Sequence, residues 1–194
     1  MAVAQAVEPL EPPFTKLLEA EMLINSLVDV PAEVFLEVFG GDKIITLNIL
    51  IKRLPAVVPW DCKHGPRYNV VEQGYLLLDL AAAKRISGCH IATPCQSQTL
   101  GRDPQLRNLD NVTGFRNLTA RQRSLVDAGT FLALFSIFLA MAIDDNDGFV
   151  SIENPLWSWL WFFAQMITLW CRAGFAAVIF HNSSMAPTTR SSPA

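Results

Sequence analysis

The chain has 194 residues, of which 51% are hydrophobic and 17% charged, and its formal net charge is −3. This apolar content is enough for one substantial core, so we expect a single folded domain. The mildly acidic balance argues against the broad basic surface that holds long stretches of nucleic acid. Any contact with nucleic acid would have to use local clusters such as Lys84–Arg85, or Arg116, Arg121 and Arg123.

The first residues, MAVAQAVEPLEPPFTK, contain no positively charged stretch followed by an apolar run, and so predict no secretory signal. We expect an intracellular protein, cytoplasmic or nuclear and not secreted. In such a compartment the four cysteines are expected to be free thiols rather than disulfides. These are Cys62, Cys89, Cys95 and Cys171.

Helical and β-type stretches alternate along the chain. Residues 1–13 are rich in Pro, and helical spacing predicts a first helix at 14–28. Apolar β-type runs predict strands at 32–39, 56–60, 88–93, 148–153 and 175–180. Helical periodicity predicts further helices at 42–53, 71–85, 119–143 and 157–172. Residues 94–118 are polar and rich in Gly, Asn and Arg, which indicates a long loop of a kind that is often functional.

Strands separated by helices of these lengths indicate right-handed βαβ units and a mostly parallel sheet covered on both faces. We therefore expect an α/β, doubly wound, Rossmann-like domain over residues 32–182. It would follow an N-terminal extension with one helix at 1–31 and precede a disordered tail at 183–194. Ligands of such sheets bind beyond the carboxyl ends of the strands. The residues that fall at these predicted ends are Gly40, Gly41, Asp61, Pro94, Cys95, Glu153 and Asn154.

Two strongly apolar runs raise the alternative of a small membrane protein. The run at 130–143 has about 14 residues, fewer than the roughly 20 that cross a bilayer. The run at 157–171 is followed by Arg172, whose burial in lipid would be costly. Both runs fit helices buried against a sheet, so we expect no membrane insertion.

Two sets of residues contain side chains that could bind a metal ion, but in neither set do the ligands have the spacing that a known type of site requires. A calcium loop with Gly148 at its sixth position would need an oxygen ligand at Ile143 and a bidentate Glu at Asn154. A zinc site would need a closely spaced Cys pair, which is absent from Cys62, His64, Cys89, His90 and Cys95. We expect no metal and interpret Glu153 as a carboxylate at a strand end.

Four short motifs, in this order and with these gaps, resemble the cytosine-C5 DNA methyltransferases, especially their short divergent members. The motifs are FLEVFGG at 35–41, WDCKHG at 60–65, IATPCQS at 91–97 and VSIENP at 150–155. The resemblance covers about residues 33–182, and Pro-Cys-Gln and Glu-Asn-Pro are its most specific parts. It implies a class I S-adenosylmethionine-dependent methyltransferase fold.

The resemblance also implies the chemistry. Carbon 5 of cytosine is a poor nucleophile, and the family activates it by adding a Cys thiolate to C6. Here that thiolate would come from Cys95, which follows a strand whose end offers backbone N–H groups. Glu153 would hydrogen-bond N3 of the base and make C6 more electrophilic. Substrate contacts would involve Gln96, Ser97, Arg102 and Asn154.

S-adenosylmethionine is the cofactor that the resemblance implies. Phe39, Gly40 and Gly41 would form the turn that lets the backbone approach its methionine end. Asp61 would bind the ribose hydroxyls, and Asn69 would lie near the adenine. Pro94 would also border the cofactor.

The chain departs from the family in two places, which leaves further interpretations open. The loop after Gly41 continues with DKIIT where the family has a second glycine pair. After Glu-Asn-Pro, no target-recognition region is recognisable. The alternatives are an inactive methyltransferase-like binding or structural module, and an enzyme whose C-terminal region is completed by a protein partner. The expected substrate is DNA, and single-stranded DNA is included because extruding a base from a duplex is costly.

Overall fold

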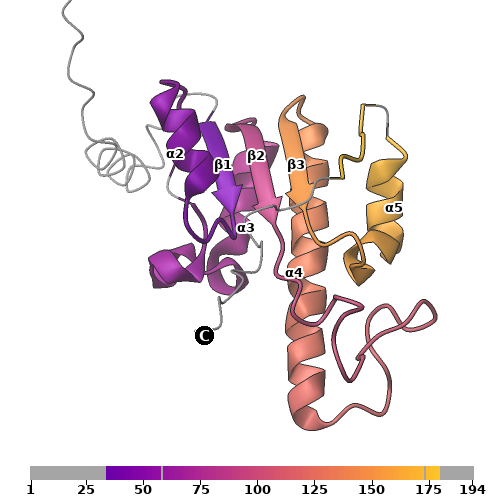
Figure 1. Ribbon diagram of the computed structural model, residues 1–194. Helices are drawn as coiled ribbons and strands as arrows, with labels where there is room; N and C mark the ends of the chain where they lie inside the picture. Colours follow the sequence, from indigo (N-terminus) through magenta and orange to yellow (C-terminus); the bar gives the residue numbers. More distant parts are fainter. Residues whose placement is uncertain (1–33, 58, 173, 180–194) are drawn as a thin grey trace, which may run out of the picture.

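The computed structural model describes residues 34–57, 59–172 and 174–179, and shows an α/β domain (Figure 1). Its sheet consists of the parallel strands β1 (Val34–Val38), β2 (Ile86–Ala92) and β3 (Phe149–Glu153), in the order β1-β2-β3. The register aligns Leu36 with Cys89 and Cys89 with Val150. All three strands therefore end at the same edge of the sheet. The helices are α2 (Ile44–Ile51), α3 (Val70–Ala82), α4 (Ala120–Asp144) and α5 (Ala164–Trp170).

The segment after α2 continues the sheet beyond β1, but not as a regular strand. Ala56 and Trp60 form isolated parallel bridges with Phe35 and Val38. Pro59 lies between them and has no N–H to donate, which limits the pairing. The predicted strand at this place is thus reduced to two bridges. Because of these bridges, β1 lies between this segment and β2.

Helices lie on both faces of the sheet. On one face, α3 and α4 pack against each other, and α4 packs against β2 and β3. On the other face, Thr46 of α2 is hydrogen-bonded to Glu37 of β1. Since neighbouring side chains along a strand point to opposite faces, Glu37 lies on the face opposite to Leu36 and the core. A parallel sheet with helices on both sides agrees with the predicted alternation of elements.

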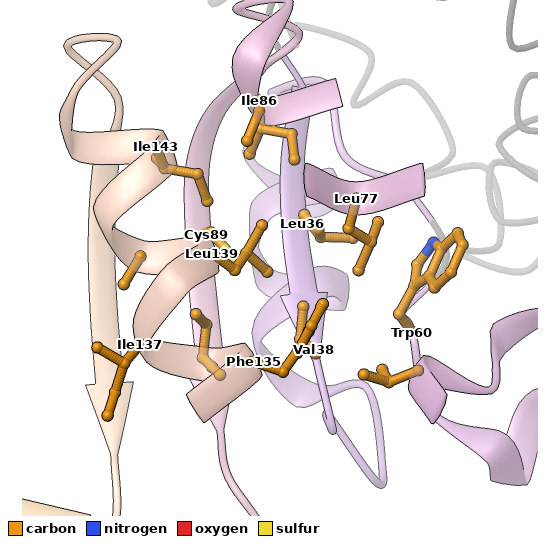
Figure 2. Packing of buried hydrophobic residues seen from close by; sticks show 14 of the residues in the cluster. Leu36, Val38, Trp60, Leu77, Ile86, Cys89, Phe135, Ile137, Leu139 and Ile143 are labelled. Carbon is orange, nitrogen blue, oxygen red and sulfur yellow. The ribbon is translucent and has the colours of Figure 1, made fainter. Parts of the chain in front are cut away.

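The hydrophobic core lies between the sheet and the helices α3 and α4 (Figure 2). Gly74 of α3 permits a close approach of the two helices, because a Cβ there would lie 2.7 Å from the ring of Phe135. Each large apolar side chain that is fully buried contributes about 1.5–3 kcal/mol. Those buried in this layer include Leu36, Val38, Leu77, Ile91, Ile137, Leu139 and Ile143.

Two of the predicted C-terminal elements are wrong. The predicted helix at 157–172 is split into a 3-10 turn at Trp159–Phe162 and the helix α5, because Phe163 between them has an extended backbone. The predicted strand at 175–180 is not formed over 175–179, where Val178 and Ile179 are exposed and no strand pairs with them. Residue 180, the predicted helix at 14–28 and the predicted tail lie outside the described residues.

Within the described part of the chain, α4 is long and apolar enough to cross a membrane by length and composition alone. It has 25 residues, more than the apolar run inside it, because a capping box formed by Thr119 and Gln122 starts the helix before that run. Half of its most apolar window is buried inside the protein. Such burial is also found in the core helix of a globular domain.

Candidate functional site

The predicted catalytic and glycine-loop residues lie at the carboxyl edge of the sheet. Phe39, Gly40 and Gly41 follow β1, and Pro94 and Cys95 come just after β2. Glu153 is the last residue of β3, and Asn154 follows it. The parallel order of the strands therefore brings three motifs that are distant in sequence to one edge.

A side-chain hydrogen bond joins the Glu-Asn-Pro motif to the Pro-Cys-Gln motif. The Nδ2 of Asn154 donates to the backbone carbonyl of Thr93 at 2.6 Å. Thr93 is itself held from the other side, since its Oγ1 donates to Oγ of Ser136 in α4 at 2.8 Å. The start of the Cys95 loop is therefore fixed against the end of β3. The Oδ1 of Asn154 is buried without a hydrogen-bond partner among the described residues, and such an acceptor is available to a bound donor.

Cys95 is the strand-end cysteine that remains outside the core. It is half-buried, and its backbone is fixed in a tight turn because the amides of Gln98 and Thr99 donate to its carbonyl at 2.8 and 3.1 Å. Cys89, in contrast, is fully buried, and burial raises the pKa of its thiol well above the ordinary value. All four cysteines of the chain are free. Cys89 is thus poorly suited to form a thiolate, whereas Cys95 is accessible from the edge.

Glu153 is exposed at the end of β3. The register places it beside Ala92 of β2, three residues before Cys95. No hydrogen bond connects Glu153 to any other described residue, so its carboxylate is available to an external group. Cys95 and Glu153, which have the predicted catalytic roles, thus lie at or just after the ends of the neighbouring strands β2 and β3.

The glycine loop and Asp61 are joined by hydrogen bonds. The N–H of Gly41 donates to Oδ2 of Asp61 at 3.2 Å, and the N–H of Lys63 donates to Oδ1 at 2.9 Å. Asp61 therefore caps the 3-10 turn at Cys62–His64 in addition to its predicted role. Gly41 has a φ of 47°, and a Cβ there would meet only Nζ of Lys63, at 3.6 Å. The backbone of Gly41 is thus open to a ligand.

Glu37 is a residue that sequence reasoning missed. Its side chain is only 3% exposed, and its Oε2 accepts hydrogen bonds from the amide and the hydroxyl of Thr46 at 2.9 and 2.6 Å. A Cβ on Gly40 would lie 2.5 Å from Cδ of Glu37, so the glycine is needed for the turn to cross this side chain. Glu37 thereby connects β1, the glycine loop and the first turn of α2. The signal was a carboxylate inside the apolar run FLEVFGG, where an acidic residue must have partners.

Asn69 has a local structural role. Its Oδ1 accepts from the amide of Val71 at 3.0 Å, which caps α3, and its Nδ2 donates to Glu72 at 3.0 Å. Asn is a preferred residue at this position of a helix because its side chain satisfies a free backbone N–H. The predicted contact with adenine stays a prediction.

The long loop at 94–118 is held together by the buried guanidinium of Arg107. Arg107 has no exposed surface, and it donates to Oγ and the carbonyl of Ser97, to the carbonyls of Val112 and Val126, and to Thr130. Burial lowers its pKa to about 10, and the charge of Asp127 opposes this effect. The loop therefore has an ordered interior although it contains no helix and no strand.

The predicted substrate-binding residues of this loop differ in accessibility. Gln96 is exposed, whereas Ser97 is only 3% exposed and is engaged by Arg107. Arg102 is half-buried, and its Nη1 donates to the carbonyl of Gln96 at 3.2 Å. Gln96 and Arg102 thus lie together on the outside of the loop, and Ser97 faces its interior.

The described residues contain no group of three or more His, Cys, Asp or Glu side chains placed to hold a metal ion. The resemblance to the cytosine-C5 methyltransferases rests on the four sequence motifs. Comparisons with protein-family models, curated proteins and solved structures gave no match.

Proposed function

We propose that this protein transfers a methyl group from S-adenosylmethionine to C5 of cytosine in DNA, through a covalent adduct of Cys95. The observation that carries the proposal is the hydrogen bond from Asn154 to the carbonyl of Thr93. This bond keeps the nucleophile motif and the carboxylate motif together at one edge. The reversal of strand order on the two sides of β1 supports a doubly wound sheet of the class I methyltransferase type, whose ligands bind at such a point.

The residues after β1 fit S-adenosylmethionine. The open space beside Gly41 and the nearby ammonium of Lys63 suit the methionine carboxylate, while the N–H of Gly41 stays bonded to Asp61. Asp61 can accept hydrogen bonds from ribose hydroxyls while it keeps its two amide donors, because each carboxylate oxygen accepts more than one bond. When bound, the cofactor supplies an electrophilic methyl group on a sulfonium.

The protein side chains would act on the base. The Cys95 thiolate adds to C6 of cytosine, and the electron pair of the C5–C6 bond becomes available at C5. Glu153, placed at N3 of the base, would share a proton with that nitrogen and favour this addition. After C5 has accepted the methyl group, removal of its proton and cleavage of the bond between C6 and Sγ restore the ring and release the Cys95 thiolate. Water accepts the proton from C5, so the products are 5-methylcytosine, S-adenosylhomocysteine and one proton, and atoms and charge balance.

The first test is calorimetric titration of the full chain with S-adenosylmethionine. We expect saturable binding that is lost in Asp61→Ala and kept in Asp79→Ala, which removes an exposed carboxylate from α3. Thermal unfolding of both variants shows whether each is folded. If the folded protein does not bind at millimolar cofactor, it does not act as an independent enzyme.

The second test traps the covalent adduct. S-adenosylmethionine is added with an oligonucleotide that contains 5-fluorocytosine. After methyl transfer, C5 carries fluorine in place of the proton that must leave, so the adduct should persist and be visible by mass spectrometry. We expect it with the parent protein and with Cys171→Ser, a change at an exposed cysteine, but not with Cys95→Ser. Cofactor binding without adduct would instead favour the inactive methyltransferase-like module. That alternative is supported by the exposed Ile44, which begins α2 at the place where the family has its second glycine pair.

A further inference from the structure

A second feature at the carboxyl side of the sheet is an open groove of about 540 Å³. One wall is formed by residues 109–114 and 116 of the long loop, and the other by residues 162–165, which include the start of α5. Figure 1 shows this loop beside α4, below α5. The volume is within the range of small-ligand sites. The groove contains none of the residues that the methyl-transfer reaction uses.

We propose that this groove binds one nucleotide of single-stranded DNA, adjacent to the cytosine that reacts with Cys95. The inference rests on the proposed function for the identity of the substrate. The groove itself offers an aromatic side chain and a guanidinium that suit a nucleotide. Phe162 is 44% exposed and its ring lies beside that of Trp159, with the centroids 5.6 Å apart. Bases stack on such aromatic side chains without regard to sequence. Arg116 is exposed, and although its backbone carbonyl accepts a hydrogen bond from Arg123, its guanidinium has no hydrogen bond or ion pair with the described residues and is available to a phosphate.

The remaining polar lining favours a nucleotide over a simple anion. Asp110 contributes an acceptor to the groove, while Asn111 and Gln165 contribute amides. A carboxylate repels free phosphate but can accept a hydrogen bond from the amino group of a base. A single arginine, in a chain of net charge −3, matches one phosphate and does not supply the field that a duplex needs.

The groove is connected to the Cys95 loop on both of its walls. The amide of Leu100 donates to the carbonyl of Trp157 at 3.0 Å, and the amide of Trp159 donates to the carbonyl of Gln98 at 2.7 Å. The second wall begins three residues after Trp159. On the first wall, Arg107 binds Ser97 and the carbonyl of Val112 at the same time. A strand in the groove would therefore pass beside the loop that holds the nucleophile.

The loop wall is also preformed. Asn111 is hydrogen-bonded to Asn108 through side chains at 2.9 Å, and the amide of Phe115 donates to Leu106 at 3.0 Å. Gly114 has a φ of 104° and sits directly on Val126, where a Cβ would lie 2.4 Å from Cγ1. Because these contacts hold the loop without a ligand, binding requires little further ordering.

The test measures fluorescence anisotropy of a labelled cytosine-containing single strand, without cofactor, over a range of salt concentrations. Arg116→Ala should weaken binding about fivefold to tenfold and lower the salt slope by roughly 0.7, the value for one phosphate of a single strand. Phe162→Leu should weaken binding about tenfold or more through lost stacking, while Phe162→Tyr keeps the affinity within about twofold. Matched controls are Lys52→Ala, at the exposed residue that caps the C-terminus of α2, and Tyr75→Leu, at an exposed position of α3.

The outcomes separate the groove from the catalytic proposal. Loss of single-strand binding in the two groove variants, with unchanged cofactor affinity and unchanged unfolding temperature, supports the groove. If the parent protein does not bind the strand, or if the groove variants bind it like the controls, the groove proposal fails even when cofactor binding and the Cys95 adduct are intact. Tighter binding of the matching RNA strand, or of the duplex, would overturn the assignment to single-stranded DNA. Groove binding without any cofactor binding would leave the groove standing and remove the methyl-transfer proposal.

Discussion

Arg107 contacts Ser97 twice, through Nε to the backbone carbonyl at 2.9 Å and through Nη2 to Oγ at 3.0 Å. Ser97 lies two residues after Cys95, and Arg107 lies ten residues further along the same loop. No carboxylate forms an ion pair with this guanidinium in the described part of the chain. A buried cation whose partners are carbonyl and hydroxyl oxygens thus holds the candidate nucleophile loop in shape.

Replacing Arg107 by Lys should destabilise the fold. Lys carries its donors on one nitrogen and cannot reach the carbonyls of Ser97, Val112 and Val126 together. Each buried carbonyl that loses its donor costs about 1–3 kcal/mol, so we expect the free energy of unfolding in urea to fall by roughly 3 kcal/mol or more. The control is Arg121→Lys at an exposed position. Equal urea midpoints for both variants would show that the network adds no stability.

Replacing Gly129 of α4 by Ala should disturb the hydrogen bonds between Arg107 and Ser97. A Cβ on Gly129 would lie 2.1 Å from Oγ of Ser97 and 3.4 Å from Nη2 of Arg107, so Gly129→Ala must displace the serine hydroxyl. We expect a net loss of about 1–3 kcal/mol despite the higher helix propensity of Ala. Gly101→Ala is the matched control, because its Cβ would meet only Thr99 at 3.6 Å. Thermal unfolding of the two variants should differ by several degrees, and no difference would contradict the close contact.

His90 of β2, which lies between Glu37 of β1 and Ser151 of β3 in the sheet, should make stability depend on pH. Nδ1 of His90 lies 2.9 Å from Oγ of Ser151, and burial lowers the pKa of His90, while the charges of Glu37 and Glu153 oppose the shift. The unfolded chain then binds more protons than the folded one below the ordinary pKa of about 6.5. Stability should therefore be highest above that pH and decrease as the pH falls from about 6.5 toward 5.

The variant His90→Gln tests this assignment in urea unfolding at several pH values. It should show a weaker dependence of the unfolding free energy on pH than the parent. Some dependence should remain, because the pKa of His64 is also lowered by burial. An unchanged slope in His90→Gln would assign the effect to other groups.

The contact between Glu37 and Thr46 should affect both stability and the glycine loop. Thr46→Val removes one of the two donors to Oε2 of Glu37, which leaves a buried carboxylate less well satisfied. The expected loss is about 1–3 kcal/mol of unfolding free energy. Thr46→Ser keeps the hydroxyl and should recover most of that loss.

The same pair of variants reports on the cofactor. Because Glu37 packs beneath Gly40, we expect Thr46→Val to weaken the binding of S-adenosylmethionine by several-fold, and Thr46→Ser to leave it nearly unchanged. Calorimetric titration at a temperature where both variants are fully folded provides the comparison. Equal affinities would separate the buried carboxylate from the cofactor loop.

The sequence predicted the buried strands and helices better than the segments with little or no strand pairing. The strands β1, β2 and β3 and the helices α3 and α4 lie within a few residues of the predicted ranges, because long apolar periodicity reflects real burial. The segment around Pro59 and the run at 175–179 have apolar residues of the same type but lack complete backbone pairing. Hydrogen bonding to a neighbouring strand is not visible in a local pattern.

The internal supports of the candidate site were harder to predict. Charged residues are mostly exposed, so neither Glu37 nor Arg107 was expected in the interior. Their burial is decided by partners that are distant in sequence, such as Thr46 for Glu37 and Val126 for Arg107. Conversely, Asn69 was expected near a ligand, and the structure uses it as a cap. Its residue type suits both roles, and only the local geometry distinguishes them.

The 25 residues of α4 make it a rod about 37 Å long that belongs to two packing environments. Near its start, Val126 and Gly129 pack on the long loop, whereas from Ala133 onward the helix is buried against the sheet and α3. The free energy needed to open a segment depends on the apolar contacts that are lost. Amide protons in the first part of α4 should therefore exchange with solvent through small openings that leave the sheet intact. Those beyond Ser136 should exchange only when the whole domain unfolds.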